Sequence, residues 1–311
     1  MALLGQKTRV SFGHESVTYG AEVNAVNWLG LQATFDPSDS IDWLEQYNAG
    51  TSTNNIELYQ AGKLNRGGTL KWVPQDFSFA TMVFGQSTRT GSYVHTVAQT
   101  TDDTLPSFTL EDAHRSGTNF IKTYTGCTIK KWTLEWSATN PVTCTADIVA
   151  QQVKKDTVLS SVTPSSVRPY MFNDVKVTIG GTEITSVISG SLTVDYNPTA
   201  EFYCNSTLAG TIGQPIPSVR RYTLTITIHE ADSTYFDTWL AGIAIAGTSK
   251  IELIRTASTD LAVFTLSNLK LASPPDPTTN SGPITQTLTF NCTAVAPVIT
   301  DSVAAYAYET T

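Results

Sequence analysis

Alternating hydrophobic and polar residues recur along the chain and predict β-strands over most of its length. The segment 221–229 has an apolar residue at every second position from Tyr222 to Ile228, with threonines between them. The segments 191–196 and 142–150 alternate in the same way. Because successive side chains of a strand point to opposite faces of its sheet, each segment offers one face to a core and one to solvent. We therefore expect a mainly β protein.

Only two segments predict helices, and both are short. The first is expected to run from Asp76, its N-cap, to Gly85, and the second from Asp232, its N-cap, to Gly242. Aspartate accepts hydrogen bonds from free backbone N–H groups at a helix start, and glycine readily adopts the left-handed conformation that ends one. The expected apolar face of the second helix consists of Tyr235, Phe236, Trp239 and Leu240.

These elements occur twice in the same order, which indicates an internal repeat. The corresponding segments are 31–40 and 192–201, 69–72 and 223–226, 76–85 and 232–242, 108–113 and 251–256, and 144–146 and 292–294. Between the halves, residues 154–170 lose the periodicity and carry Ser, Pro and charged residues, as linkers do. We expect two tandem modules, residues 1–155 and 156–311, each a β-sandwich or barrel with one short flanking α-helix.

Two long stretches do not fit a compact core and lie at equivalent points of the two halves. Residues 47–68 and 202–221 are polar or rich in Gly and Pro, with scattered apolar residues. Loops of this length inside a small β domain are usually functional or disordered. We interpret both as arms that order against a neighbouring subunit. The assembly residues predicted on them are Ile56, Leu58, Tyr59, Leu64, Arg66, Leu208, Ile212, Ile216 and Arg220.

Composition narrows the classes of function. Charged residues make up 15% of the 311 residues, and the formal net charge is −8. A low charge density with many β-branched hydroxyl residues suits strands and large shared surfaces. The acidic balance argues against a protein that grips nucleic acid through a basic face. Because we find neither a signal-peptide pattern nor an apolar stretch long enough to span a membrane, we expect synthesis and assembly in a cytoplasm.

The four cysteines are expected to be free and buried. A predicted hairpin in residues 127–151 places Cys144 opposite Glu135 and Cys127 opposite Gln152, with a β-bulge near residues 130–131. The two sulfur atoms then lie on the order of 26 Å apart along the strands, too far for a disulfide. No spacing of Cys and His suits zinc.

Candidate catalytic residues have simpler structural interpretations. His14, Glu15 and Ser16 stand together, but they lack a strained Gly-x-Ser-x-Gly turn with an apolar strand leading into it. We interpret residues 13–23 as a solvated lead-in that docks on its own module or on a neighbour, with Gly20 permitting the turn into the first strands. His95 is expected at a strand edge or in a loop, and His114 in a hairpin turn.

Other chemistry is not predicted, and we expect no catalytic residue, cofactor or metal. The four histidines lack metal-ligand spacing. Carboxylates are scattered, and a glycosidase pair stays open because such residues meet only in the fold. Four tryptophans occupy apolar-periodic positions and are expected in the core rather than in a sugar site: Trp72, Trp132, Trp136 and Trp239.

The order of these motifs resembles the opening of major tail tube proteins of long-tailed bacterial and archaeal viruses. The resemblance rests on the lead-in HESVTYGAEV, on VNWLGLQATFDPSDSIDWLEQYNAG, and on a strand and short helix ending in FATMVFG. It covers most of residues 13–152 and recurs in order through 175–296. It implies β-sandwich or barrel modules whose sheets join side by side into a ring around a channel for viral DNA.

The resemblance also implies partners and stoichiometry. Rings stack through long loops into a tube that meets tape-measure, terminator and baseplate or tip proteins. Single-module members form sixfold rings, so a two-module chain implies three copies in a pseudo-sixfold ring. An acidic balance is expected where DNA slides past without sticking. The alternatives are a secreted or surface-layer β protein or carbohydrate-binding module, and a catalytic β protein.

Overall fold

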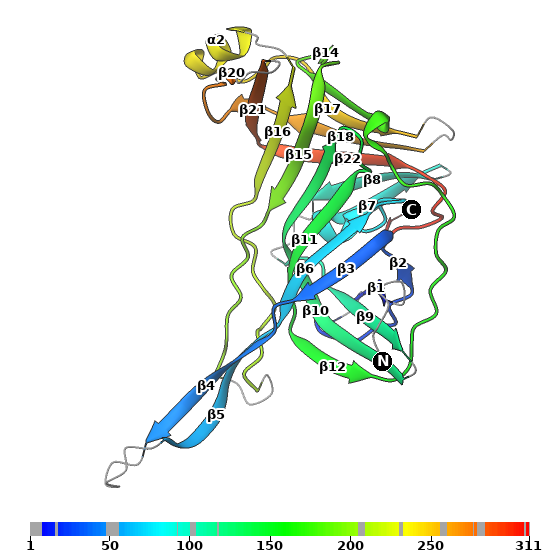
Figure 1. The fold of residues 1–311 in the computed structure, drawn as a ribbon, viewed down its shortest axis with the longest axis vertical. Helices are drawn as coiled ribbons and strands as arrows, with labels where there is room; N and C mark the ends of the chain where they lie inside the picture. Colours follow the sequence, from blue (N-terminus) through cyan, green and yellow to red (C-terminus); the bar gives the residue numbers. More distant parts are fainter. Residues whose placement is uncertain are drawn as a thin grey trace.

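The chain forms a mainly antiparallel β-structure in which one long sheet packs against two shorter ones (Figure 1). A hairpin arm projects from one end of the molecule, and helix α2 lies at the other end. This arrangement confirms the predicted mainly β class with short helices. The computed structural model describes residues 8–15, 18–47, 56–91, 93–99, 104–116, 118–204, 209–229, 233–255, 260–275, 277–278, 284–307 and 309–310.

The large sheet has the strand order β3-β6-β11-β10-β15-β16-β21-β19. Its strands are β3 (Leu31–Pro37), β6 (Gly67–Val73), β11 (Thr143–Val149), β10 (Thr118–Ser137), β15 (Val187–Asp195), β16 (Arg221–Ile228), β21 (Thr285–Cys292) and β19 (Lys270–Leu271). The short β20 (Pro277–Thr278) also pairs with β21. The alternation seen in the sequence buries one face of this sheet, as in Leu134, Leu192 and Leu224, and turns the hydroxyl residues outward.

The two shorter sheets cover the apolar face of the large one. The first contains part of β10 with β1 (Thr8–His14), β2 (Asn27–Trp28), β9 (Phe108–Ser116) and β12 (Gln152–Asp156). The second contains β14 (Thr182–Glu183), β13 (Val175–Ile179), β17 (Ser249–Ile254), β18 (Leu261–Ser267), β22 (Ala294–Thr300), β8 (Val94–Gln99), β7 (Gly85–Thr90) and β23 (Glu309–Thr310).

Strand pairing follows the same order in the two halves of the chain. In the large sheet, β3-β6-β11-β10 is followed by β15-β16-β21-β19. In the covering sheets, β1-β9-β10-β12 of the first half has the counterpart β13-β17-β18-β22 in the second. The halves meet where β10 pairs with β15, from Lys131 opposite Asp195 to Ser137 opposite Ser189.

Strand β10 belongs to two sheets and bends at Gly126. The backbone of Gly126 has φ +63°, and a Cβ atom there would lie 2.8 Å from Cβ of Gln151. Its N–H donates to Glu15 Oε1 at 2.9 Å, which also accepts from the Thr109 hydroxyl, while Glu15 Oε2 accepts from the N–H of Gly20. The lead-in therefore docks on its own module through a buried carboxylate, and the expectation of a solvated segment is wrong for Glu15.

The two helices have opposite environments. Helix α1 (Ala80–Phe84) is buried throughout, between β10 and the β7–β8 hairpin. It begins later than predicted, because Asp76 accepts from the N–H and hydroxyl of Ser78 in the turn before it. Helix α2 (Ser233–Ala241) has no buried residue, and Trp239 is only half-buried, so the predicted core position is wrong. Gly85 and Gly242 end the helices as predicted, and the proposed cap Asp232 lies outside the described residues.

One continuous apolar core joins the two halves, with aromatic contacts across the joint. The Trp132 ring packs against Phe84 of α1 and against Phe264 of β18, with ring centroids 6.2 and 6.1 Å apart. Phe264 also meets Phe77 edge to face at 5.5 Å. Trp72, Trp132 and Trp136 are buried, which confirms three of the four tryptophan predictions. The two halves of the chain thus share a single interior.

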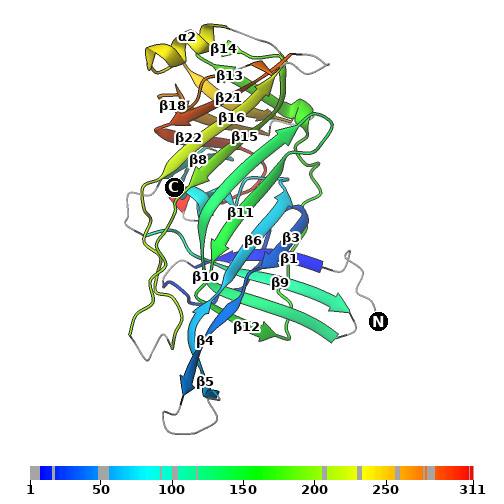
Figure 2. The same ribbon diagram turned by 60° about the vertical axis from the view of Figure 1, so that its left-hand side comes forward.

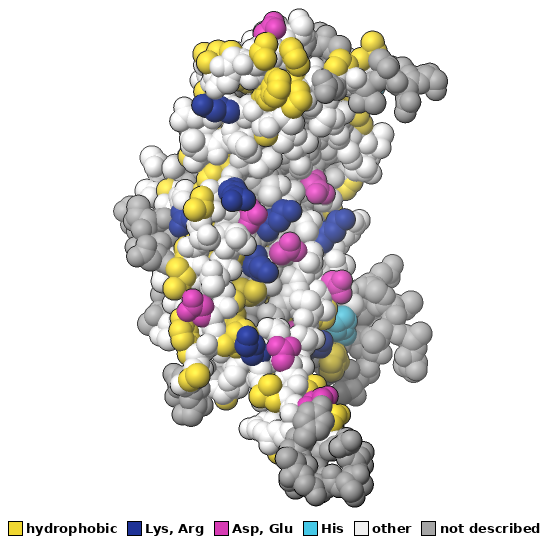
Figure 3. Space-filling view, turned by 90° about the vertical axis from the view of Figure 1, so that its left-hand side faces the viewer, with side chains coloured by type: hydrophobic (Ala, Val, Ile, Leu, Met, Phe, Trp, Pro, Cys, Tyr) yellow, Lys and Arg dark blue, Asp and Glu magenta, His cyan; other side chains and the backbone are white. Residues whose placement is uncertain are grey.

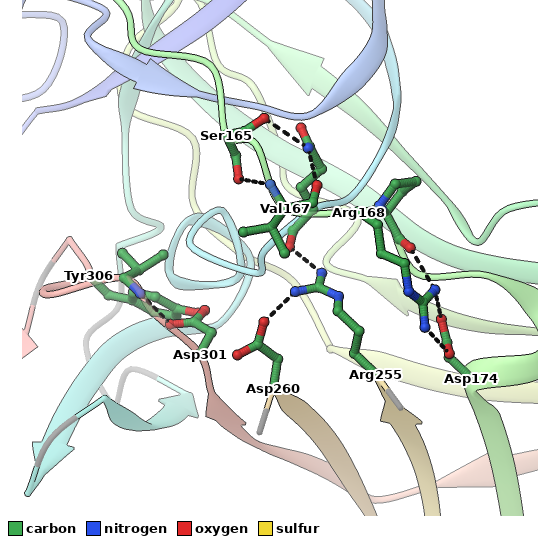
Figure 4. A network of polar contacts seen from close by, with 11 residues as sticks. Ser165, Val167, Arg168, Asp174, Arg255, Asp260, Asp301 and Tyr306 are labelled. Atoms are coloured by element: carbon green, nitrogen blue, oxygen red, sulfur yellow. Dashed lines mark hydrogen bonds and ion pairs between the residues drawn. The ribbon is translucent and has the colours of Figure 1, made fainter. Parts of the chain in front are cut away.

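A buried polar network holds the segment that links the halves (Figure 4). Gln75 Nε2 donates to the carbonyl oxygens of Ser165, at 3.0 Å, and Val167. The Arg255 guanidinium donates to the carbonyl of Gln75 at 2.6 Å and pairs with the Asp260 carboxylate. Groups of the first half, the linker and the second half therefore hydrogen-bond to one another in the interior.

The structure corrects the predicted register of the hairpin in residues 127–151 and the predicted surroundings of the cysteines. Cys144 lies opposite Leu134 rather than Glu135, because the turn places the register one residue from the predicted one. Cys127 pairs with Phe108, and Gln152 with Thr125, because the chain leaves the hairpin after β11. The bulge is confirmed between Ile129 and Lys131. All four cysteines are free, and burial raises the pKa of the Cys127 and Cys144 thiols. The predicted burial is wrong for the other two, since Cys204 is exposed and Cys292 is half-buried.

The histidines lie in more ordered surroundings than predicted. His95 is buried within β8, where its ring stacks on Tyr306 with centroids 3.9 Å apart and its Nε2 lies 3.0 Å from the carbonyl oxygen of Val303. His114 belongs to strand β9 rather than to a turn, and its Nε2 lies 3.0 Å from Asp112 Oδ2. Both histidines are held in ordered strands because those strands pair with strands from distant parts of the sequence.

Candidate assembly surfaces

The most prominent surface feature is a hairpin arm that projects from the large sheet, as two views show (Figure 1, Figure 2). It consists of β4 (Ser40–Tyr47) and β5 (Ile56–Asn65), in place of the long loop expected over residues 47–68. Trp43, Leu44, Leu58 and Tyr59 are each more than half exposed. Contiguous exposed apolar side chains of this kind mark interaction sites.

Both faces of this arm are apolar. Trp43 lies opposite Ala61 and Tyr59 opposite Glu45, so Trp43 and Tyr59 share one face. Leu58 lies opposite Gln46, two residues from Leu44, and these two leucines share the other face. A single flat partner covers only one face of a ribbon, so complete burial of this arm requires partner surfaces on both sides.

The predicted residues of the first arm occupy different depths. Leu58 and Tyr59 are exposed, whereas Ile56 and Leu64 are half-buried. At the base of the arm, Arg66 Nη1 donates to the carbonyl oxygens of Ser40, at 3.2 Å, and Asn65. Sequence reasoning missed Ile41, Trp43 and Leu44; the apolar residues at both parities of SIDWLEQY were the available signal.

The second predicted arm packs beside the base of the first. Gly210 accepts a hydrogen bond at its carbonyl from the N–H of Leu64, and the Lys63 ammonium lies 5.2 Å from the ring centroid of Phe202. Ile212 is buried, and its carbonyl accepts from Gln151 Nε2 at 3.3 Å. Residues of the second half therefore brace the arm of the first half.

The remaining predicted residues of the second arm are dispersed. Ile216 is more than half exposed, in an isolated bridge with Thr199. The Arg220 guanidinium lies 5.4 Å from the ring centroid of Tyr196, an arrangement that favours cation–π attraction. Leu208 lies outside the described residues.

The two ends of the large sheet carry further candidate contacts. At one end, β3 is the last strand, and beside it a groove of about 650 Å³ is lined by apolar residues that include Trp28, Leu31 and Trp72. At the other end, near α2, Leu240 and Ile243 are more than half exposed and Phe236 is 40% exposed. An unpaired sheet edge with apolar neighbours is a template for pairing with another chain.

The outward face of the large sheet is broad and polar (Figure 3). It is formed by the alternate residues of β6, β11, β10, β15, β16 and β21 that point away from the core, many of them Thr or Ser; we call it the hydroxyl face. Lys, Arg, Asp and Glu side chains stand among one another on this side of the molecule rather than in separate patches. Such a face offers hydrogen-bonding groups without a field of a single sign.

Within the described ranges, no cluster of three or more His, Cys, Asp or Glu residues is arranged to hold a metal ion. The described helices include none that is both long and apolar enough to cross a membrane. An exposed apolar arm, the end strands of the large sheet and the exposed helix α2 are typical of proteins that build larger β-structures from copies of themselves.

Comparison with known families identifies this class. Residues 5–292 match the phage tail tube protein family, and the chain therefore belongs to that family. No curated protein sequence matches the chain. Membership makes it a structural component of the virion tail, and the resemblance read from the sequence is confirmed at the level of the family.

Proposed function

We propose that this chain polymerises into stacked rings that form the tail tube, the conduit for genome delivery, with three chains in each pseudo-sixfold ring. The supporting observation is the joint between β10 and β15, where the two halves share continuous antiparallel pairing. If the halves are two copies of one module, that joint is an internal example of the ring contact. The domains are then residues 1–155 and 156–311.

The repeated pairing order supports this duplication. Strand β15 occupies in the second half the place of β3 in the first, and β19 the place of β10. The ring contact between chains is therefore the pairing of β3 in one chain with the edge formed by β19 and β20 in the next. Each chain loses both free edges when the ring closes, which removes the liability that open sheets carry.

The two helices support the same scheme. Helix α1 lies at the internal joint, where the Tyr196 hydroxyl of the second half donates to the carbonyl of Val83. Helix α2, its counterpart, exposes Phe236 and Leu240 at the free end of the large sheet. In the ring, the first module of the next chain covers α2 beside the groove at β3.

The β4–β5 arm accounts for the stacking of rings into a tube, and the tube meets the other tail proteins. Because both faces of the β4–β5 arm are apolar, it inserts between two modules of the adjacent ring. The tube made in this way meets the tape-measure, terminator and baseplate or tip proteins, is assembled in the host cytoplasm, and carries viral DNA transiently. The chain acts by assembly, without catalysis.

Electron microscopy of the purified full chain tests this function. We expect rings and tubes of uniform bore under conditions that favour polymerisation. Stable monomers at high concentration, with binding or hydrolysis of a glycan instead, would overturn the proposal.

A further inference from the structure

The arm and a small apolar cleft lie at opposite ends of the large sheet. The arm leaves the sheet where β3 ends at Pro37 and β6 begins at Gly67. The cleft lies at the other end of the strands, where β10 ends at Ser137 and β15 begins at Val187. Figure 1 shows the arm at one end of the molecule and β14, which borders the cleft, at the other. Rings that stack with one polarity join opposite ends of two chains, so an arm meets the end that carries the cleft.

Both halves of the chain contribute to this cleft, which we call the seam cleft. Its volume is about 390 Å³, and its apolar lining includes Trp136 of the first half and five residues of the second: Phe172, Val175, Val177, Ile184 and Val187. Phe172 is 41% exposed, so part of this lining faces solvent in the single chain. The ion pair of Lys176 with Glu183, at 2.7 Å, balances two charges on the rim.

The position of the seam cleft suits an arm that is apolar on both faces. The arm exposes aromatic side chains on one face and leucines on the other. Trp136 approaches the cleft from the first half and Phe172 from the second, so an occupant contacts both halves at once. Because the side chains of a ribbon point to its two faces, a ribbon that enters between two surfaces buries both of its apolar faces.

The number of arms matches the number of seam clefts. The described residues form one projecting arm in each chain, the β4–β5 hairpin. In the second half, the corresponding segment packs beside the base of this arm: Gly210 accepts at its carbonyl from the N–H of Leu64, 2.9 Å away, and the Phe202 ring lies under the Lys63 ammonium. Each chain likewise has one internal joint with its cleft, whereas the proposed ring holds twice as many module joints as arms.

We propose that the arm of each chain binds the seam cleft of a chain in the adjacent ring, so that rings are joined at the internal joints and not at the contacts between chains. The inference rests on the proposed function, in which rings stack through the arm. It names the surface that receives the arm and gives the internal joint a role in stacking as well as in ring closure. The groove beside β3 is then left to α2 of the neighbouring chain.

Photo-cross-linking of assembled tubes identifies the surface that the arm contacts. In the full chain, Tyr59, which is exposed on the arm, is replaced by the photoreactive aromatic p-benzoylphenylalanine, and cross-linked peptides are identified by mass spectrometry. We expect cross-links between chains at residues 136–138 and 172–188. Cross-links at the groove beside β3, which includes Trp28, Leu31 and Trp72, or at any other surface, overturn the inference, as does the absence of cross-links from tubes.

Two substitutions in the seam cleft test its role in stacking. Phe172→Glu places a charge in the cleft, and Thr185→Trp fills it with a bulky side chain; both residues are exposed in the single chain. We expect single rings and roughly tenfold fewer tubes from each variant, because an unpaired charge or a steric clash at a buried contact weakens binding strongly. Circular dichroism verifies folding of both.

Val158→Glu is the matched control, since it adds the same charge at an exposed residue of the linker, and it is expected to form tubes as the wild type does. Tubes of normal length from both cleft variants overturn the inference. Electron microscopy of the wild type separates it from the proposed function. If the wild type forms tubes and the cleft variants do so equally well, only the receiving surface is refuted, whereas a wild type without rings or tubes overturns the proposed function itself.

Discussion

The phenolic hydroxyl of Tyr196 donates a hydrogen bond to the backbone carbonyl of Val83 and so joins the second half of the chain to helix α1 of the first. Both residues are buried. The carbonyl belongs to the last turn of a short helix, where it has no partner within the helix. Tyr196 is therefore a buried polar link between the two halves.

Tyr196→Phe is expected to lower the free energy of unfolding by about 1–3 kcal/mol, because it leaves a buried carbonyl without a donor. Urea denaturation measures the change. Tyr203→Phe is the control, since Tyr203 is exposed, and it is expected to shift stability by less than about 0.5 kcal/mol. Equal effects of the two substitutions would show that the link across the joint contributes nothing specific.

Glu15 is expected to be a stabilising carboxylate. Glu15→Gln replaces an anion that accepts from the N–H groups of Gly20 and Gly126 and from the Thr109 hydroxyl, all at 2.9 Å. Hydrogen bonds to charged groups contribute about 1.5–3 kcal/mol, and we expect a loss of that order in chemical denaturation. Glu22→Gln, at an exposed ion pair, serves as control. A Glu15 variant as stable as wild type contradicts this account of the lead-in.

Strand alternation, the β-bulge, the glycine helix stops and the free cysteines could be predicted because each depends on local sequence. The crossing of β10 between two sheets could not, since it depends on Glu15 and on Gln151 packing at Gly126. Pairing of β8 with β22 joins residues about two hundred positions apart, and no local pattern reports it. The arm was interpreted as a loop because its apolar residues lie on both faces, which removes the period of two.

Asp301 is expected to make the free energy of unfolding depend on pH. Burial raises the pKa of its carboxyl from 3.8 to about 6, against the opposing effect of hydrogen bonds from Tyr306 and from the N–H of Val303. The folded chain thus binds this proton more tightly than the unfolded chain. The stability that protonation confers is fully present below about pH 3.8 and is lost as pH rises through about 6.

Asp301→Asn removes this titration. Relative to wild type, the variant is expected to gain about 2–3 kcal/mol of stability between roughly pH 4 and pH 7. His95 and Asp76 are other titratable groups that face this carboxyl. Thermal or urea unfolding at several pH values measures the difference. The control is Asp237→Asn on the exposed helix α2. Its pH profile of stability is expected to run parallel to that of wild type. A parallel profile for Asp301→Asn as well would refute the assignment.

The arm is expected to act in assembly and not in folding. Trp43→Ser/Tyr59→Ser removes the apolar residues of one face of the hairpin, both already exposed in the single chain. We expect stability within about 0.5 kcal/mol of wild type and single rings without tubes in electron micrographs. Val158→Ser, on an exposed apolar residue of the linker, is the control and should still form tubes. Tubes of normal length from the arm variant would exclude this role.

The number of chains in one ring tests the central claim most directly. The claim is that the joint of β10 with β15 inside each chain is equivalent to the contact that forms between neighbouring chains of the ring. Native mass spectrometry of single rings, obtained from the arm variant, gives that number without interference from stacking. The account predicts three chains per ring. Six chains per ring would contradict it, because the two halves could not then occupy equivalent places.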